Sequence, residues 1–261
     1  MFIEERHQAI LEMLAQAGRI TTGEIQERFG ISYDSAKRDL RILEEKGLLK
    51  RTHGGAIIMR SVGWSGQTQE KTGKERAEYV KRNYLNIARR AIKEIGSQEV
   101  IYVTAASVGY LMAQNMPDDK IFTVVTNSIA IAEELRKKGN ITVILAGGEM
   151  SANGSFYDGF SLEILKRLHF DKCFITSACI SVKAGLSVQK SNNMELLNTV
   201  IQNSRKVYGL YPVEKIGMDS VISICGLDSL DVLITDEETS KEDLQAFEHA
   251  GIAVIIAGKE I

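Results

Sequence analysis

Residues Thr104–Ser107 are predicted to form a tight bend of small residues between an apolar run, Val100–Val103, and the start of a helical pattern. Bends of this kind often hold phosphate groups, because the free backbone N–H groups at the start of a helix point toward a bound anion. This bend contains no glycine and no acidic residue, and it offers only two hydroxyl groups. Its sequence is compatible with a phosphorylated ligand, with some other ligand, and with a turn that binds nothing.

A second group of residues has the character of a nucleic-acid-binding surface. If residues 32–47 form a helix, Lys37, Arg38 and Arg41 lie together on one side, opposite an apolar stripe. Across residues 32–60 there are seven Lys and Arg against four Asp and Glu, although the whole chain carries a net charge of −2. Local charge, and not the total, therefore indicates DNA as a partner. The apolar stripe consists of Ala36, Leu40 and Leu43.

The basic side of this helix could bind DNA, or it could be an ordinary surface that faces only solvent. The neighbouring elements favour DNA binding. Two helical patterns precede it, and the second begins with a capping-box pattern at Thr21 and ends at Gly30. After it, two short apolar runs flank His53–Gly55, which predicts a β-hairpin. Three short helices and a hairpin are the parts of a winged helix-turn-helix domain, which we place at residues 1–58. The residues expected to contact DNA are Thr21, Ser32, Tyr33, Ser35, Lys37, Arg38, Arg41, Lys50, Arg51 and His53.

The rest of the chain predicts a larger α/β domain at residues 77–261, joined to the first by a linker at residues 59–76. The linker is polar and contains glycine, and its Trp64 is expected to pack against a neighbouring domain or subunit. Eight apolar runs follow, most of them separated by helical segments. Continuous apolar strands that alternate with helices favour a Rossmann-like, mostly parallel sheet that is covered on both faces.

The composition excludes several classes of protein. No apolar run approaches the roughly 18–20 residues of a membrane helix, and the acidic N-terminal segment does not resemble a secretory signal. Three cysteines without a CxxC pair predict neither a disulfide framework nor a zinc site, and the four histidines are too scattered for a metal site. Cys173 and Cys179 are expected to face the core. We therefore expect a reduced, cytoplasmic protein with no metal and no cofactor.

The run from Ile31 to Ala56 resembles the DNA-binding segment of the DeoR family of bacterial transcriptional regulators. One departure is Lys37, where the family usually has a second arginine. Lysine keeps the charge but lacks the bidentate fork that reads guanine, so we expect Lys37 to contact phosphate and Arg38 or Arg41 to read a base. The residues that carry the resemblance are Ile31-Ser32, Lys37-Arg38, Asp39-Leu40, Leu43-Glu44, Gly47 and Arg51-Thr52-His53-Gly54-Gly55-Ala56.

Residues 75–258 resemble, more weakly, the carboxy-terminal domain of the same family. That domain is similar to ribose-phosphate isomerase and usually senses a phosphorylated sugar. Ligands of such sheets bind outside the carboxyl ends of the strands, so the resemblance and this rule indicate the same positions. The residues expected to bind an effector are Thr104, Ala105, Ala106, Ser107, Thr126, Asn127, Gly147, Gly148 and Lys215.

Departures from the family pattern predict a changed effector. The family typically has Asp-Ser-Gly-Thr-Thr at residues 104–108, so a carboxylate suited to sugar hydroxyls is missing here. A second acid of the family is replaced by Pro212, and a serine by Glu214. We expect a small anionic metabolite other than a simple sugar phosphate, held by Ser107 and Lys215. A degenerate domain that binds no ligand is the alternative.

Two other classes of function compete with regulation. The first is an isomerase-like enzyme, which would need a tuned acid–base pair to converge in one pocket. The second is a structural nucleoid protein, which would bind DNA without sequence preference. We expect instead a non-enzymatic, sequence-specific repressor that binds double-stranded operator DNA as at least a homodimer, because operators are symmetric. The residues that could form an acid–base pair are Glu149, Asp158, Glu195 and Lys215.

Overall fold

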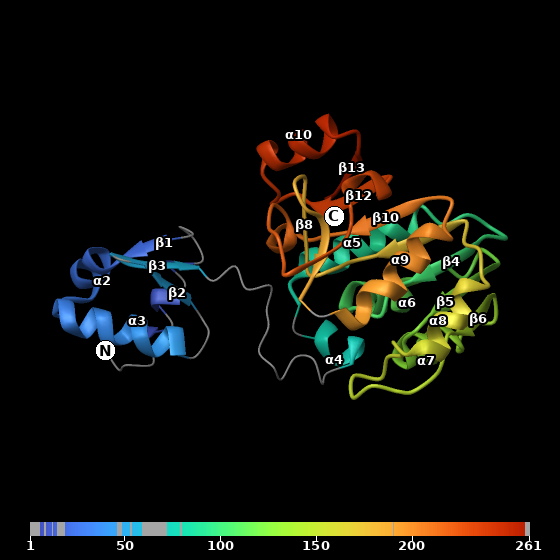
Figure 1. Cartoon of the computed structure of the whole chain (residues 1–261), viewed down its shortest axis with the longest axis horizontal. Helices are drawn as coiled ribbons and strands as arrows, with labels where there is room; N and C mark the ends of the chain where they lie inside the picture. Colours follow the sequence, from blue (N-terminus) through green and yellow to red (C-terminus); the bar gives the residue numbers. More distant parts are fainter. Residues whose placement is uncertain are drawn as a thin grey trace. The chain divides into compact units, whose positions relative to one another are not determined.

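The computed structural model describes residues 6–7, 9–11, 13–14, 19–45, 49–52, 54–58, 72–78, 80–189 and 191–258 (Figure 1). The chain divides into two compact units, Met1–Ser65 and Gly66–Ile261, which we call the amino-terminal and carboxy-terminal units. His53 and Trp64 lie outside the described residues. Helix α4, Gly73–Ala77, lies in the last part of the predicted linker. No helix among the described residues is long and apolar enough to cross a membrane.

The amino-terminal unit contains the elements predicted for a winged helix-turn-helix domain. The described residues between 6 and 14 are helical, and helices α2 and α3 follow. Strands β2 and β3 form the predicted hairpin, and a third strand, β1, pairs antiparallel with β3. The sequence pattern does not predict β1, because three residues with one apolar side chain are too short a signal. The bounds are β1 Arg19–Thr21, α2 Thr22–Phe29, α3 Tyr33–Glu45, β2 Leu49–Thr52 and β3 Gly55–Ile58.

Helix α2 begins and ends at the residues that its sequence predicts. The side chain of Thr21 accepts a hydrogen bond from the N–H of Glu24, and the Glu24 carboxylate accepts one from the N–H of Thr21 at 2.6 Å. Gly30 ends the helix in the left-handed conformation, with φ of 62°. The short turn from Gly30 then leads directly into α3.

The core of the amino-terminal unit contains the predicted apolar stripe of α3. Ala36, Leu40 and Leu43 are each at most 1% exposed. They pack with apolar residues of the first helix, α2 and all three strands. The opposite side of α3 is therefore left for solvent or a partner.

The carboxy-terminal unit is built on a seven-stranded sheet in the order β13-β12-β10-β7-β4-β5-β6. Every pair of neighbouring strands in this sheet is parallel, as the continuous apolar runs predict. The strands are β4 Val100–Val103, β5 Phe122–Thr126, β6 Ile141–Leu145, β7 Lys172–Ile175, β10 Val207–Leu210, β12 Val232–Asp236 and β13 Ala253–Ala257.

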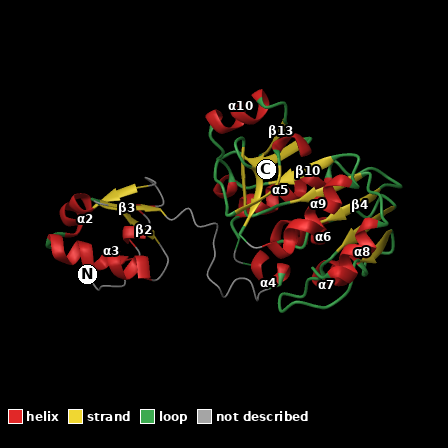
Figure 2. Cartoon of the chain, viewed as in Figure 1, coloured by secondary structure: helices red, strands yellow, loops and turns green. Residues whose placement is uncertain are grey.

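Helices cover both faces of this sheet (Figure 2). One core cluster joins α5, α6 and α7 to one face, and the other joins α8, α9 and α10 to the opposite face. Strand β4 shows the alternation, because Ile101 and Val103 belong to the first cluster and Tyr102 to the second. The helices are α5 Arg82–Ile92, α6 Ser107–Asn115, α7 Ile129–Leu135, α8 Gly159–Lys166, α9 Met194–Gln202 and α10 Lys241–His249.

A second, three-stranded sheet lies outside the parallel one. Its order is β11-β9-β8, and both of its pairings are antiparallel. The apolar run Val221–Cys225, expected among the parallel strands, supplies β11 instead. Its Ser223 is exposed, whereas a strand inside a parallel sheet is buried on both faces. The strands are β8 Cys179–Ser181, β9 Gly185–Val188 and β11 Ile222–Cys225.

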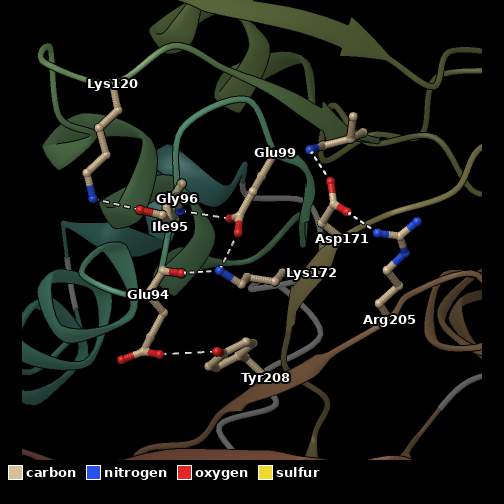
Figure 3. Close-up of polar contacts among 10 residues, drawn as sticks. Glu94, Ile95, Gly96, Glu99, Lys120, Asp171, Lys172, Arg205 and Tyr208 are labelled. Atoms are coloured by element: carbon tan, nitrogen blue, oxygen red, sulfur yellow. Dashed lines mark hydrogen bonds and ion pairs between the residues drawn. The ribbon is translucent and has the colours of Figure 1, made fainter.

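The amino ends of the parallel strands are joined by a polar network (Figure 3). Lys172, at the start of β7, donates 2.6 Å hydrogen bonds to the Glu99 carboxylate and to the Glu94 carbonyl. The Glu94 carboxylate in turn accepts a hydrogen bond from the Tyr208 hydroxyl at 3.1 Å. Asp171 joins the N–H of Val100 to Arg205 at the same edge. These groups are engaged with one another at the amino edge of the sheet.

We expect the variant Lys172→Met to lower the free energy of unfolding of the chain by about 1–3 kcal/mol, since it removes two charge-assisted hydrogen bonds from a largely buried group. Lys137→Met is the control, because Lys137 pairs with Glu134 on the surface and should contribute about 0–1 kcal/mol. Urea unfolding of both variants measures the difference. Equal midpoints would show that the network contributes no more than a surface ion pair.

Candidate DNA interface and effector site

The exposed side of α3 carries the predicted basic residues. Lys37, Arg38 and Arg41 are all exposed, opposite the buried apolar stripe. The ammonium group of Lys37 lies 4.7 Å from the ring centre of Tyr33, which is itself 44% exposed. Three cations and an exposed aromatic ring on one helix face form a surface that matches the charge of a DNA backbone and the width of a major groove.

The two serines at the start of α3 hold the helix end. The Ser32 hydroxyl accepts a hydrogen bond from the N–H of Ser35 at 3.2 Å and lies 2.9 Å from the Ser35 hydroxyl. Ser32 therefore acts as the N-cap of α3. Thr21 has the same function for α2. These three side chains position helix ends whose N–H groups can meet phosphate.

A buried ion pair fixes α3 against the first helix. Asp39 is 2% exposed and accepts hydrogen bonds from the guanidinium of Arg6, at 2.7 and 3.2 Å. The Nε2 atom of His7 lies 3.1 Å from the same carboxylate. The hydrogen bond to Asp39 raises the pKa of Arg6 above its ordinary value. Because Asp39 is neutralised inside the domain, it does not reduce the positive charge of the exposed face.

The hairpin is anchored to α3 through Glu44. Its carboxylate accepts a hydrogen bond from the N–H of Arg51 at 2.8 Å and lies 3.8 Å from the Arg51 guanidinium. Gly55 allows the close approach of β1, since a Cβ atom there would overlap the carbonyl oxygen of Ile20. The strand β2 contains Lys50, but its side chain lies outside the described part of the chain, as does His53.

The carboxyl ends of neighbouring strands bring the predicted effector residues to one edge of the parallel sheet. Thr104 follows β4, Thr126 ends β5 and Gly147 closely follows β6. Lys215 follows β10, which is separated from β4 by β7. Its ammonium group reaches over the end of β7, where it donates hydrogen bonds to Thr176 Oγ1 at 3.3 Å and to the carbonyl of Ser177 at 3.0 Å.

Thr176 and Ser177 were not among the predicted site residues. They directly follow β7, and each is 7% exposed. The rule that ligands bind beyond strand ends would have included them, because β7 lies between β4 and β10 in the sheet. They lie at the end of β7, between β4 and β10 in the sheet, and Lys215 is hydrogen-bonded to both.

The bend itself has two buried hydroxyls that have no hydrogen-bond partner among the described residues. The side chains of Thr104 and Ser107 are 6% and 8% exposed, and neither hydroxyl has a hydrogen-bond partner among the described residues. No fully enclosed polar side-chain atom of the described chain lacks a partner, so both hydroxyls face space that solvent can enter. Ala106 is the N-cap of α6 and supplies no side-chain cap. The start of this nine-residue helix is therefore open to an anion.

The tightness of the bend depends on Gly109 in the first turn of α6. A Cβ atom at Gly109 would overlap the carbonyl oxygen of Thr104. We expect Gly109→Ala to lower the free energy of unfolding by about 1–3 kcal/mol, because backbone must move to accept the methyl group. Gly139→Ala is the control, since nothing lies within 4 Å of a Cβ there. Thermal unfolding compares the two, and equal midpoints would contradict the tight bend.

The side chains of Thr126 and Asn127 are buried beneath the strand ends, so they are not exposed to a ligand. Asn127 is 1% exposed, and its amide accepts a hydrogen bond from the Tyr102 hydroxyl at 2.8 Å and donates one to the carbonyl of Phe156 at 2.8 Å. Thr126 is fully buried. The two residues hold the strand end and the loop near Phe156 in place, so we assign them a positioning role.

The two glycines after β6 differ in their surroundings. Nothing lies within 4 Å of a Cβ at Gly147, whereas a Cβ at Gly148 would overlap the Asp158 carboxylate. Asp158 caps α8 and accepts hydrogen bonds from the N–H groups of Ser161 and Glu149. Gly147 thus leaves room for close approach to the backbone, while the space beside Gly148 is filled.

Three of the predicted acid–base residues have other partners or surroundings in the described structure, and Glu149 contacts Asp158 through its backbone N–H. Asp158 caps α8, Glu195 is exposed on α9, and Lys215 is bonded at the end of β7. Glu214 faces α5 instead, where its carboxylate accepts a hydrogen bond from Asn83 at 3.2 Å. Within the described residues there is also no group of three or more His, Cys, Asp or Glu that could hold a metal ion.

Family models match both units. A DeoR-like helix-turn-helix domain matches residues 6–62, and the DeoR C terminal sensor domain matches residues 81–237. The chain belongs to the DeoR family. The resemblance carried by the α3 segment and by the strand ends is therefore confirmed.

Relatives of this DeoR-family chain match along nearly its whole length. The HTH-type transcriptional regulator GolR of Listeria innocua is 29% identical and covers 98% of this chain and 100% of its own. The HTH-type transcriptional repressor GlcR of Bacillus subtilis is 30% identical, over 100% of this chain and 98% of its own. Among solved structures, ribose 5-phosphate isomerase A of Methanocaldococcus jannaschii is similar at 13% identity, with a TM-score of 0.37 over 51% of this chain and 53% of that chain.

Proposed function

We propose that the protein is a transcriptional repressor that binds operator DNA through α3 and the hairpin β2–β3. The observation that carries this proposal is the exposed basic face of Lys37, Arg38 and Arg41 on the second helix of a DeoR-type helix-turn-helix. This helix has its apolar stripe buried and its start capped, so its polar side is presented as a rigid surface. Rigid presentation lowers the ordering cost of reading bases in a groove.

The carboxy-terminal unit is proposed to bind a small anionic effector at the bend before α6. Two buried hydroxyls without a partner among the described residues and an open helix start favour an anion there, and Lys215 provides a positive charge beside β7. No carboxylate replaces the one that the family carries at position 104. The loss of this acceptor weakens selection for sugar hydroxyls, so we propose an anionic metabolite other than a simple sugar phosphate.

The same proposal places the protein in the cytoplasm as a homo-oligomer, at least a dimer. Operators read by helix-turn-helix proteins consist of two half-sites related by symmetry, which require two copies of α3 at a fixed spacing. The two copies of α3 can fit the operator only at one spacing. An effector that binds more tightly to the protein in one arrangement than in another would therefore change the fraction of protein that can bind the operator. Neither a cofactor nor a catalytic step enters this scheme.

Footprinting on the promoter region next to the protein's own gene tests DNA binding. A protected, symmetric site that the whole chain binds in preference to unrelated DNA is the expected result. Protection without sequence preference would instead favour a structural nucleoid protein.

Thermal-shift titration of the whole chain tests the effector site, with anionic and neutral metabolites compared at matched ionic strength. Ser107→Ala and Lys215→Ala are expected to reduce the shift caused by an anionic hit. Lys183→Ala is the control, because Lys183 is exposed on the turn between β8 and β9. A strong shift with a simple sugar phosphate would refute the changed effector, and unimpaired binding by both variants would show that the bend holds no ligand. Turnover of a sugar phosphate by the whole chain would favour the isomerase-like alternative.

A further inference from the structure

Helix α4 is the first described element of the carboxy-terminal unit, and it packs directly on the bend. Its first residue, Gly73, is buried, and a Cβ atom there would lie 3.4 Å from the carbonyl oxygen of Ala106. The same Cβ would lie 3.7 Å from Cβ of Tyr110, one turn along α6. Gly73 therefore lies against the backbone of the proposed effector site itself.

The start of α4 also touches the loops that follow the next two strands. A Cβ atom at Gly154, in the loop after β6, would lie 3.6 Å from the Thr72 methyl group and 3.0 Å from Ile129 Cγ2. Ile129 begins α7, which follows β5, and its N–H donates to the Gly154 carbonyl at 3.0 Å. The start of α4 thus lies against α6, which follows β4, and against the Gly154 loop, which follows β6, and α4 also neighbours α7, which follows β5.

A helix this short depends on its surroundings. Thr72 caps it, accepting a hydrogen bond from the N–H of Glu75 at 3.2 Å, while the Glu75 carboxylate accepts one from the N–H of Thr72 at 2.6 Å. Five residues are nevertheless far fewer than the number that forms a stable isolated helix, so α4 exists because it is docked. The formation of α4 therefore depends on the surface of the bend on which it packs.

We propose that α4 reports occupancy of the bend to the amino-terminal unit. This inference rests on the proposed effector site and concerns its regulation. A ligand held by the bend fixes the backbone around Ala106, which stabilises the surface on which Gly73 packs. Docked α4 in turn fixes the point from which the chain continues, through residues 59–71, toward the DNA-binding helices. Effector binding and operator binding are then coupled through a single small contact.

The test uses the full chain, inorganic phosphate as the probe, and the operator fragment found by footprinting. Gly73→Leu should block docking, because its side chain would meet the Ala106 carbonyl and Tyr110. Gly73→Ala is the matched control, since its Cβ would make only ordinary contact. Amide exchange is followed at residues 73–77 and at residues 105–110, together with thermal shift and operator affinity.

In the parent and in Gly73→Ala, phosphate should slow exchange at both segments and change operator affinity by about fivefold or more. In Gly73→Leu, phosphate should still protect residues 105–110, but the change in operator affinity should be lost. Thr72→Ala, which removes the side-chain cap of α4, should reduce that change even if Gly73→Leu fails to fold.

Two outcomes overturn the inference and separate it from the proposed function. In the first, phosphate slows amide exchange at residues 105–110 but not at residues 73–77, and its effect on operator affinity is the same in the variants as in the parent. The bend then binds an anion, and α4 does not report it. If phosphate neither shifts unfolding nor protects residues 105–110 in the parent, the anion site fails and the coupling fails with it.

Discussion

Replacing Asp39 by alanine is expected to lower the free energy of unfolding of the amino-terminal unit by about 3–5 kcal/mol, because Arg6 and His7 lose their buried anionic partner. The carboxylate is 2% exposed, and the Arg6 and His7 side chains are 14% and 8% exposed. The positive charge left behind would have little access to water. This anchor joins the first helix to α3, so its loss should also abolish operator binding.

Two controls separate the buried charge from other effects of the substitution. Asp39→Asn keeps an oxygen that can accept one of the hydrogen bonds, and it should cost less than Asp39→Ala. Asp34→Ala removes an exposed acid from the same helix and should change stability little. Urea unfolding of the full chain, with amide exchange followed at residues 19–45, gives the comparison. Equal stability of Asp39→Ala and Asp34→Ala would show that the ion pair is not an anchor.

The parts of the fold that follow from local pattern could be predicted from the sequence. The stripe of Ala36, Leu40 and Leu43, the Thr21 capping box and the Gly30 C-cap each depend on residues within a few positions of one another. The parallel strands are continuous apolar runs, which need no partner to be recognised. The short strands β1, β8 and β9 could not be found in this way, because each has at most two large apolar side chains and is stabilised mainly by the strands it pairs with.

The candidate site was predictable in position but not in detail. The rule that ligands bind at strand ends selects Thr104 and Lys215 from the sequence. The partners of the site residues, however, lie far along the chain. Asn127 is held by Tyr102, and the space at Gly148 is taken by Asp158. Such pairs are set by tertiary packing, and no spacing in the sequence reveals them.

Truncation of the basic residues of α3 should separate reading of bases from attraction to phosphate. Arg38→Ala and Arg41→Ala are each expected to cost about 1–3 kcal/mol of discrimination between the operator and a base-substituted site, wherever that arginine reads a base. Lys37→Ala should instead weaken binding to both sites about equally. Its lysine cannot form the bidentate contact, and it lies over the Tyr33 ring as a point charge.

The salt dependence of binding distinguishes the two kinds of contact. Losing one phosphate contact at Lys37 should reduce the slope of log affinity against log salt by about 1, because one fewer counterion is released. Arg28→Ala is the control, since Arg28 is exposed in the last turn of α2, outside α3. Fluorescence anisotropy on both DNA sites at several salt concentrations measures affinity and slope together. If the three α3 variants have the same affinity and salt slope as Arg28→Ala on both DNA sites, α3 does not contact the operator. If only Lys37→Ala differs, α3 attracts DNA, and the sequence is read by the hairpin or by the shape of the duplex.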